Sequence, residues 1–262
     1  MQSDTRRAVL ITGASTGIGA TYADRFARRG HDLVLVARDA MRLADLASRL
    51  RDTYRVAADV LPADLTDRDD LARVAARLRE DASIGVLVNN AGATAAGGFA
   101  GQDAATLDGL IALNVSAVTQ LAAAAVARFL PEGNGAIVNL ASVLAIAPEV
   151  QPGIYSATKA FVLTLSQSLQ REFENKGVYV QAVLPAATRT EIWQRAGLDI
   201  ANVPGVMAVD ELVDAALVGF DRREAITIPP LPDEAQWQAF QKARTAMLPN
   251  FRQEHPAARY RI

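Results

Sequence analysis

Two side chains that could move a proton stand four residues apart in the chain. Tyr155 and Lys159 belong to the run YSATK, and Ser142 lies thirteen residues before the tyrosine. Residues at this spacing share one face of a helix, so a helix here places a phenol beside an ammonium. A nearby positive charge favours the phenolate and is expected to lower the pKa of the tyrosine. The pair predicts proton transfer at Tyr155 near neutral pH, although an ordinary helix surface can carry the same two residues.

A glycine-rich run upstream, TGASTGIG at residues 12–19, points to a ligand site. It follows an apolar segment and leads into a helical pattern, which is the strand–turn–helix context that makes such a motif informative. Glycines let a backbone approach a pyrophosphate, and the helix start offers unpaired N–H groups. A tight turn without a ligand is the alternative. The residues expected to bind a dinucleotide are Gly13, Ser15, Gly17, Ile18 and Gly19.

Arg38 stands nineteen residues past Gly19, where the second strand is expected to end. An acidic residue near such a point holds the ribose hydroxyls of NAD, whereas an arginine accommodates the 2′-phosphate of NADP. Arg38 therefore favours NADP(H) over NAD(H). Asp39 follows immediately, so a shift of one residue would reverse this preference. A solvated loop arginine is the other alternative.

Short apolar runs alternate with helical patterns along the chain. The expected strands are 8–12, 32–37, 56–60, 86–89, 135–140, 178–184 and 226–228. The expected helices are 18–29, 41–54, 67–81, 104–130, 152–176 and 209–221. Nearly continuous apolar strands between helices indicate a parallel sheet that is buried on both faces. The pattern predicts an α/β fold with a doubly wound, Rossmann-type parallel sheet of about seven strands and helices on both faces.

No repeat or linker divides the chain, so residues 1–262 are interpreted as one domain. Within it, 186–207 is expected to form a substrate lid, and 229–262 a C-terminal tail with a helix around 234–247. Ile192, Trp193 and Leu198 indicate an apolar substrate unless they pack on the body of the fold. Arginines alternate with aromatic residues in the tail, which favours docking onto a neighbouring subunit over nucleic-acid binding.

Composition excludes several classes of function. The 262 residues are 50% hydrophobic and carry a net charge of −2, so neither nucleic acid nor an anionic membrane surface is an expected partner. The chain has no cysteine and only His31 and His255, so no metal site is expected. The N-terminal residues lack the long apolar region of a signal peptide, and polar residues interrupt the apolar stretch 113–130. A cytoplasmic protein is expected.

Taken together, the motifs resemble those of the short-chain dehydrogenase/reductase family in its compact, single-domain form. The resemblance covers about residues 8–228. It rests on TGASTGIG at 12–19, ADL at 63–65, NNAG at 89–92, Asn114 in ALNVSA, Ser142 in NLASV, YSATK at 155–159 and PAATRT at 185–190. The spacing of tyrosine and lysine differs from that of dedicated enoyl reductases, and the glycine loop is longer than in the epimerase branch.

The resemblance implies a catalytic role for four residues. Tyr155 would transfer the proton, and Lys159 would bind the nicotinamide ribose and depress the pKa of Tyr155. Ser142 would hydrogen-bond the substrate oxygen. Asn114 would hold a water molecule that completes a proton relay.

The resemblance also implies cofactor contacts. Three groups are expected: Asp64 and Leu65 beside the adenine, Asn90, Ala91 and Gly92 beneath the adenine ribose, and Pro185, Thr188 and Thr190 at the nicotinamide carboxamide. One position departs from the family pattern, because Ala186 replaces the glycine that usually follows the proline. Alanine adopts positive φ only at a cost, so this turn is expected to be reshaped.

The expected function is NADP(H)-dependent interconversion of a carbonyl and a secondary alcohol on an apolar small molecule. A cofactor-binding sensor or scaffold without turnover is one alternative, and an isomerase or C=C reductase of the same fold is another. The apolar residues of 160–169 and of the long helix before it surround most of each helix, which predicts burial on a second face. A homodimer or homotetramer with a two-fold four-helix contact is therefore expected, and the resemblance implies the same contact.

Overall fold

A parallel sheet forms the centre of the protein. The structure is a computed structural model that describes residues 7–96, 98–197 and 199–261. The seven strands are ordered β3-β2-β1-β4-β5-β6-β7, and every neighbouring pair is parallel. They are β1 (Ala8–Thr12), β2 (Leu33–Ala37), β3 (Ala58–Pro62), β4 (Ile84–Asn89), β5 (Gly135–Leu140), β6 (Val178–Val183) and β7 (Ile226–Thr227). The predicted doubly wound α/β fold is confirmed, and its strand order reverses between β1 and β4, where such folds bind ligands.

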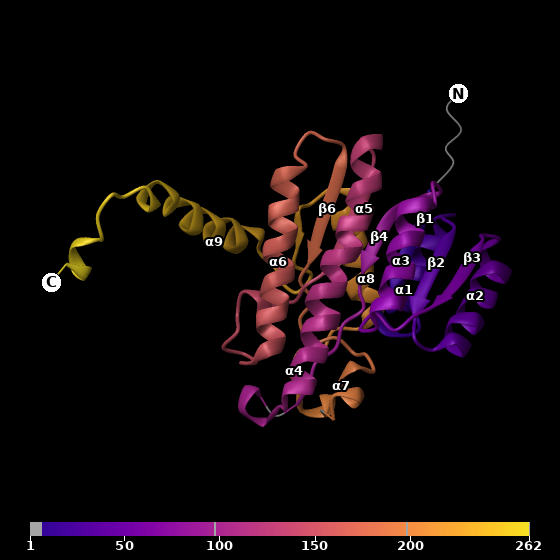
Figure 1. The fold of residues 1–262 in the computed structure, drawn as a ribbon. Coiled ribbons are helices and arrows are strands. Elements are labelled where there is room, and N and C mark those ends of the chain that lie inside the picture. Colours follow the sequence, from indigo (N-terminus) through magenta and orange to yellow (C-terminus); the bar gives the residue numbers. More distant parts are fainter. Residues whose placement is uncertain (1–6, 97, 198, 262) are drawn as a thin grey trace. The chain divides into compact units, whose positions relative to one another are not determined.

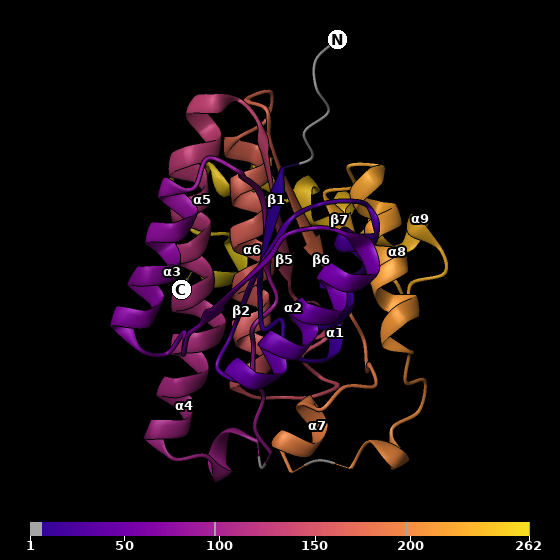
Figure 2. The same cartoon turned by 90° about the vertical axis from the view of Figure 1, so that its right-hand side faces the viewer.

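Helices cover both faces of the sheet. One face carries α1 (Gly17–Arg28), α2 (Ala40–Tyr54) and α8 (Val209–Asp221), and the other carries α3 (Arg68–Glu80), α5 (Val118–Glu132) and α6 (Ile154–Glu172). Figure 2 shows α1 and α8 on one side of the strands and α3 and α5 on the other. Because each strand packs on helices at both faces, its side chains are buried in both directions. This explains the near-continuous apolar runs.

Helix ends follow local capping chemistry. Asp39, Asp67 and Asp103 each accept a backbone hydrogen bond at the start of a helix, namely α2, α3 and α4 (Ala104–Ile111). These caps satisfy N–H groups that have no partner within the helix. The predicted helix 152–176 begins later, at Ile154, because Gly153 has a φ of 135° that no helix contains. It also ends earlier, at Glu172.

The long helix predicted at 104–130 is not a uniform α-helix. A π-helical segment, Ala112–Ala117, separates α4 from α5 and contains Asn114. The Asn114 side chain is buried and bonds to groups outside its own helix, which accompanies the local change in helical pitch. π-Helical turns inside α-helices occur frequently at functional sites. Sequence periodicity does not distinguish such a turn from a continuous helix.

Two features lie outside the sheet and its covering helices. Within the predicted lid, α7 (Ile192–Arg195) is a single turn, and a parallel bridge joins Thr188 to Met207. Residues up to Pro229 form one compact unit, and those from Pro230 form a second. The second unit contains α9 (Glu234–Ala246), which has no buried residue and carries stacked Trp237 and Phe240 rings with centroids 5.5 Å apart. Figure 1 labels α9 beyond the last strand in the chain order.

One continuous helical stretch among the described residues, Ala104–Glu132, is long and apolar enough to cross a membrane by length and composition. Core helices of soluble proteins meet the same criterion. Here Leu121, Ala125 and Phe129 of this stretch belong to the buried cluster that includes residues of β4 and α3. Part of this stretch therefore packs against the sheet as a core helix.

Candidate active site

A cavity of about 1120 Å³ lies at the carboxyl ends of the strands. Its wall is built by the segments that follow β1, β2, β3, β4, β5 and β6, together with the start of α6 and the lid. The wall contains most of the residues predicted from sequence: Gly13, Ser15, Gly17, Ile18, Arg38, Asp64, Leu65, Asn90, Ala91, Gly92, Ser142, Tyr155, Lys159, Pro185, Thr188 and Thr190. Gly19 and Asn114 lie behind it and do not line it. The structure thus brings together residues that are up to 177 positions apart, from Gly13 to Thr190.

The glycine loop is packed too closely for a side chain. Gly13 has a φ of +66°, and a Cβ there would lie 2.7 Å from Asn90 Nδ2. At Gly19 an added Cβ would collide with the backbone of Gly13, so this glycine allows the turn to close without touching the cavity. Thr16 precedes α1 and makes no side-chain cap, which leaves the first N–H groups of α1 open to a ligand. These features fit the phosphates of a dinucleotide.

Thr12 joins the glycine loop to the segment that follows β4. Its Oγ1 accepts hydrogen bonds from the backbone N–H groups of Asn90 and Ala91, each at 3.0 Å. The Asn90 side chain in turn donates to the carbonyl oxygens of Thr12 (2.9 Å) and Gly13 (3.2 Å). Asn90 therefore shapes the cavity wall through the backbone of the loop. Sequence reasoning assigned Thr12 to a strand end and missed this role.

Arg38 and Asp39 have different surroundings at the end of β2. Asp39 accepts a hydrogen bond from the backbone N–H of Arg42 at 3.0 Å and caps α2. The Arg38 side chain is 72% exposed, and its Nη1 lies 3.8 Å from Asp64 Oδ2. Burial would raise the pKa of Asp64, but hydrogen bonds from Thr66 and the charge of Arg38 hold this pKa below its usual range. Arg38 is thus a cation at the cavity wall, whereas the Asp39 carboxylate is engaged by its own helix.

Tyr155 and Lys159 lie on the first two turns of α6 and face the cavity. Lys159 Nζ donates a 2.7 Å hydrogen bond to the carbonyl oxygen of Leu140, at the end of β5. The same nitrogen lies 5.6 Å from the centroid of the Tyr155 ring. The lysine is only 6% exposed although it is charged. This geometry matches the predicted common helix face.

The predicted direction of the Tyr155 pKa is wrong. Burial raises the pKa of Tyr155 to about 12 and lowers the pKa of Lys159 to about 8. Both shifts have one cause, because a site with little water disfavours the charged form of each group. The ammonium lies over the tyrosine ring at 5.6 Å, and this contact does not outweigh the loss of hydration. Tyr155 is therefore a protonated phenol at neutral pH.

Ser142 and Asn114 are both fixed by protein contacts. Ser142 Oγ donates to the carbonyl oxygen of Pro185 at 3.3 Å and accepts from the backbone N–H of Leu144 at 3.1 Å. Asn114 Oδ1 accepts from the backbone N–H of Ala93, and its Nδ2 donates to the carbonyl oxygen of Ala93 and to Thr158 Oγ1. The amide of Asn114 thus anchors the loop after β4. Its contact with a water molecule stays a prediction.

The segment after β6 avoids the strain expected at Ala186. Among the described residues, those with positive φ other than glycine are Arg55, Asn175 and Arg223, so the turn at Ala186 forms with ordinary backbone angles. Thr188 Oγ1 donates to the carbonyl oxygen of Ala186 at 3.0 Å, which closes the turn. The expected penalty for alanine does not arise, because this turn needs no left-handed residue here.

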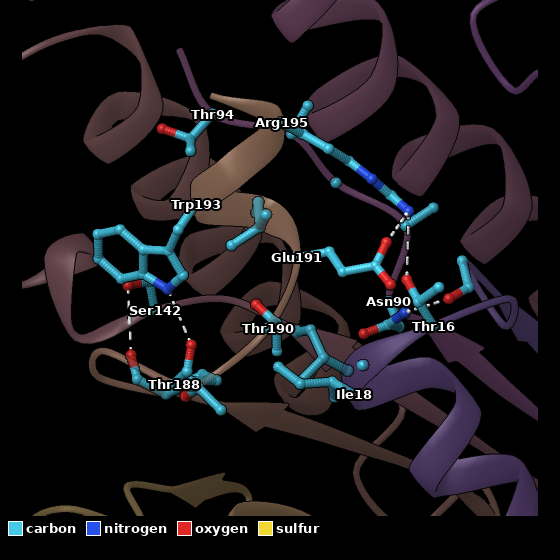
Figure 3. Close-up of a pocket in the computed structure, with 18 of the residues that line it drawn as sticks. Thr16, Ile18, Asn90, Thr94, Ser142, Thr188, Thr190, Glu191, Trp193 and Arg195 are labelled. Atoms are coloured by element: carbon cyan, nitrogen blue, oxygen red, sulfur yellow. Dashed lines mark hydrogen bonds and ion pairs between the residues drawn. The ribbon is translucent and has the colours of Figure 1, made fainter. Parts of the chain in front are cut away.

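Apolar lid residues reach the wall of the cavity. Ile192 and Trp193 line it, and the indole nitrogen of Trp193 donates to the carbonyl oxygen of Thr188 at 2.8 Å. Figure 3 draws the hydrogen bond of the indole to Thr188 as a dashed line. The third predicted residue, Leu198, lies outside the described residues. The lid also contributes Glu191 and Arg195 to the wall, which sequence reasoning missed because no motif marks them.

Comparisons with known proteins agree with this fold. The family model for short chain dehydrogenase matches residues 7–200. A very-long-chain 3-oxoacyl-CoA reductase from Bos taurus is 34% identical over 187 residues, which cover 70% of this chain and 60% of that protein. The chain thus matches less than two thirds of this relative's own length.

Two solved structures resemble the whole chain. A short-chain dehydrogenase from Sphingobium yanoikuyae in complex with NADPH has a TM-score of 0.96 and 62% identity, covering 97% of this chain and 100% of that one. A bulky-bulky ketone specific alcohol dehydrogenase from Comamonas testosteroni has a TM-score of 0.92 and 56% identity, covering 98% and 99%.

The fold and the cavity define an oxidoreductase with a Rossmann-type NAD(P)-binding site. The chain belongs to the short-chain dehydrogenase/reductase family. No group of three or more His, Cys, Asp or Glu side chains within the described part of the chain is arranged to hold a metal ion.

Proposed function

We propose that the protein is an NADP(H)-dependent oxidoreductase that interconverts a ketone and a secondary alcohol. One observation carries this proposal. Tyr155, Lys159 and Ser142 line the same cavity as the open start of α1 and Arg38. Proton-transfer groups and a phosphate-binding helix terminus therefore share one space, as hydride transfer to a carbonyl requires.

The residues divide the chemical work in the proposed reaction. When bound, the nicotinamide supplies the hydride in reduction and accepts it in oxidation. Tyr155 donates its hydroxyl proton to the carbonyl oxygen in reduction, since burial raises the pKa of Tyr155 to about 12 and keeps it protonated. Ser142 Oγ turns its hydrogen from Pro185 towards the same oxygen. Lys159 keeps one N–H on Leu140 and has two further donors for the cofactor ribose and Tyr155.

The NADP(H) preference rests on the surroundings of Arg38. Its guanidinium is exposed at the cavity wall, whereas the neighbouring carboxylate of Asp39 caps α2. An arginine suits a 2′-phosphate, because its charged N–H groups match phosphate oxygens. The Sphingobium yanoikuyae neighbour in complex with NADPH supports the same preference.

The proposed substrates are ketones with two bulky apolar substituents. The cavity is about 1120 Å³, and Ile192 and Trp193 form apolar parts of its wall. The specificity named for the Comamonas testosteroni neighbour, at 56% identity, supports this choice. Apolar wall residues favour bulky apolar substituents, because these remove more apolar surface from water.

Consumption of NADPH with matched ketones tests the proposed function. Ketones with two aryl or long alkyl groups are expected to be reduced at least tenfold more efficiently, in kcat/KM, than methyl ketones of similar reactivity. The product is a secondary alcohol, identified by chromatography. Binding of NADPH without consumption across the panel would instead support a sensor or scaffold. Loss of a C=C bond from an enone, with the carbonyl retained, would support the reductase alternative.

We also propose that the protein assembles through α5 and α6. Most of the apolar residues on these helices are buried within the chain, including Val162, Leu163 and Phe129. The uncovered face is narrower than predicted and runs along α6 at helical spacing through Ala157, Phe161, Thr164 and Ser168. Small side chains in such a stripe allow two helices to approach closely across a two-fold axis.

Light scattering at micromolar concentration is expected to report a dimer or tetramer. Phe161→Glu places a charge in the proposed contact and should shift the mass towards the monomer, because an unpaired charge is costly to bury. Ser48→Glu is the matched control, because Ser48 is exposed on α2, which covers the opposite face of the sheet. A monomeric wild-type protein contradicts the proposal.

A further inference from the structure

Three side chains from two distant parts of the chain form an ion cluster in the cavity wall. The carboxylate of Glu191, next to α7, accepts from Arg42 Nη1 at 2.8 and 3.0 Å and from Arg195 Nη2 at 2.8 Å. Arg195 Nη2 also lies 3.4 Å from Thr16 Oγ1. Figure 3 shows Glu191 and Arg195 beside Thr16. The cluster thus connects the lid to α2 and to the glycine loop.

The two arginines stand where phosphate groups would bind. Arg42 lies on the first turn of α2, whose cap is the residue after Arg38, so it is close to the proposed 2′-phosphate position. Arg195 reaches Thr16 at the open start of α1, where a pyrophosphate is expected. Glu191 therefore occupies arginine donors that phosphate oxygens could use. A carboxylate and a phosphate compete for the same planar N–H groups.

The cluster is exposed enough to exchange partners. The side chains of Arg42, Glu191 and Arg195 are 48%, 42% and 53% exposed. The pKa of Glu191 lies below its usual range, chiefly because of the hydrogen bond from Arg42, so this carboxylate is ionised at neutral pH. Solvent-exposed ion pairs contribute little to stability. A doubly charged phosphate at the same place would be a stronger partner for Arg42.

The same short helix carries an apolar part of the cavity wall. Glu191 immediately precedes α7, and α7 carries Trp193, which lines the cavity and whose indole donates to the carbonyl oxygen of Thr188. The Arg42–Glu191 ion pair thus connects α2 to the residue that directly precedes α7. Only one residue separates Glu191 from Trp193 in the chain.

We propose that Glu191 is a specificity-determining residue that couples recognition of the 2′-phosphate to the position of α7. Its carboxylate holds Arg42 and Arg195 when no phosphate is present, which weakens phosphate binding and fixes Trp193. The 2′-phosphate displaces Glu191 from Arg42 and loosens this connection. The inference rests on the proposed NADP(H) function and deepens it.

Glu191→Gln tests the coupling, because glutamine has nearly the same shape and no charge. Calorimetric titration is expected to show that NADPH affinity rises about threefold to tenfold, since a competing charge is removed from a partly exposed site. NADH affinity should rise less, because only NADPH carries the phosphate that meets Arg42. In the double variant Arg42→Gln/Glu191→Gln, the additional gain for NADPH should disappear.

The position of α7 is measured without turnover. The chain has two tryptophans, so Trp237→Phe leaves Trp193 as the only tryptophan, which can be excited selectively over tyrosine. Adenosine 2′,5′-bisphosphate, which lacks a nicotinamide, should make Trp193 more accessible to acrylamide, whereas adenosine 5′-monophosphate should not. In Glu191→Gln, access should already be high and should not change with either nucleotide.

A matched control is Asp214→Asn. Asp214 accepts two hydrogen bonds from Arg25, at 2.7 and 3.2 Å, and neither residue lines the cavity. This variant removes the charge of a carboxylate that is 57% exposed and bound to an arginine, so cofactor affinities and Trp193 quenching should stay as in the wild type.

Three results would overturn the inference. The first is an equal change in NADPH and NADH affinity in Glu191→Gln, and the second is no change in either affinity. The third is acrylamide quenching of Trp193 that does not change when adenosine 2′,5′-bisphosphate is added. Both measurements are independent of catalysis. If the wild-type protein binds NADPH but reduces no carbonyl, the proposed function is contradicted. The affinity and quenching data would still test the role of Glu191.

Discussion

Tyr155→Phe should lower turnover by roughly two to four orders of magnitude. The substitution removes the hydroxyl and keeps the ring that lies 5.6 Å from Lys159 Nζ, so the shape of the site is preserved. Reduction then has no positioned proton donor at the carbonyl oxygen. Cofactor affinity should remain near that of the wild type, because the ring and Lys159 are still present. Stopped-flow reduction under single-turnover conditions measures the chemical step, and equilibrium titration measures binding.

Lys159→Ala is the informative companion to this variant. Its ammonium is expected both to bind the cofactor ribose and to stabilise the ionised tyrosine, so affinity and turnover should fall together. A phenylalanine variant with more than about a tenth of wild-type turnover, with chemistry rate-limiting, contradicts proton transfer by Tyr155. Loss of turnover alone is thus expected for Tyr155→Phe, and loss of both turnover and cofactor affinity for Lys159→Ala.

Arg38→Ala should weaken NADPH binding by about tenfold to a hundredfold and leave NADH binding nearly unchanged. A hydrogen bond to a charged group contributes about 1.5–3 kcal/mol, which corresponds to one or two decades in affinity. The effect should shrink at high salt, because Arg38 is exposed and its field is screened. Titration of both cofactors against wild type and variant gives the ratio directly.

Asp39→Asn is the matched control for cofactor choice. Asparagine also caps helices well, so α2 should remain intact while the charge next to Arg38 is lost. If Asp39 binds the ribose hydroxyls, this variant loses NADH affinity. Equal wild-type affinities for the two cofactors, or an Arg38→Ala variant with an unchanged preference for NADPH, would refute the assignment to Arg38.

Local patterns in the sequence were sufficient for the fold and for the position of the main motifs. The strands are near-continuous apolar runs, and a parallel sheet buried on both faces requires such runs. The predicted helix starts at 41 and 67 lie within one residue of the observed Ala40 and Arg68, where Asp39 and Asp67 cap N–H groups only two or three positions away. The common face of Tyr155 and Lys159 likewise follows from the helical repeat alone.

Other properties depended on contacts between residues far apart in the chain. The pKa of Tyr155 is raised rather than lowered because the surrounding fold excludes water, and a spacing of four residues contains no information on burial. The π-helical turn at Asn114 accompanies bonds to Ala93 and Thr158, which no helical period reveals.

The sequence by itself determined the elements and the proton-transfer and phosphate-binding motifs, because backbone preferences and helical periodicity act over a few residues. Tertiary structure alone decided which charges meet. Arg42 and Glu191 are 149 positions apart, and the sequence around each of them predicts only a solvent-exposed charged side chain. They become partners only because the crossovers of a parallel sheet bring α2 and the lid to the same edge. The hydration and the charge of the cavity therefore depend on how these distant segments pack together.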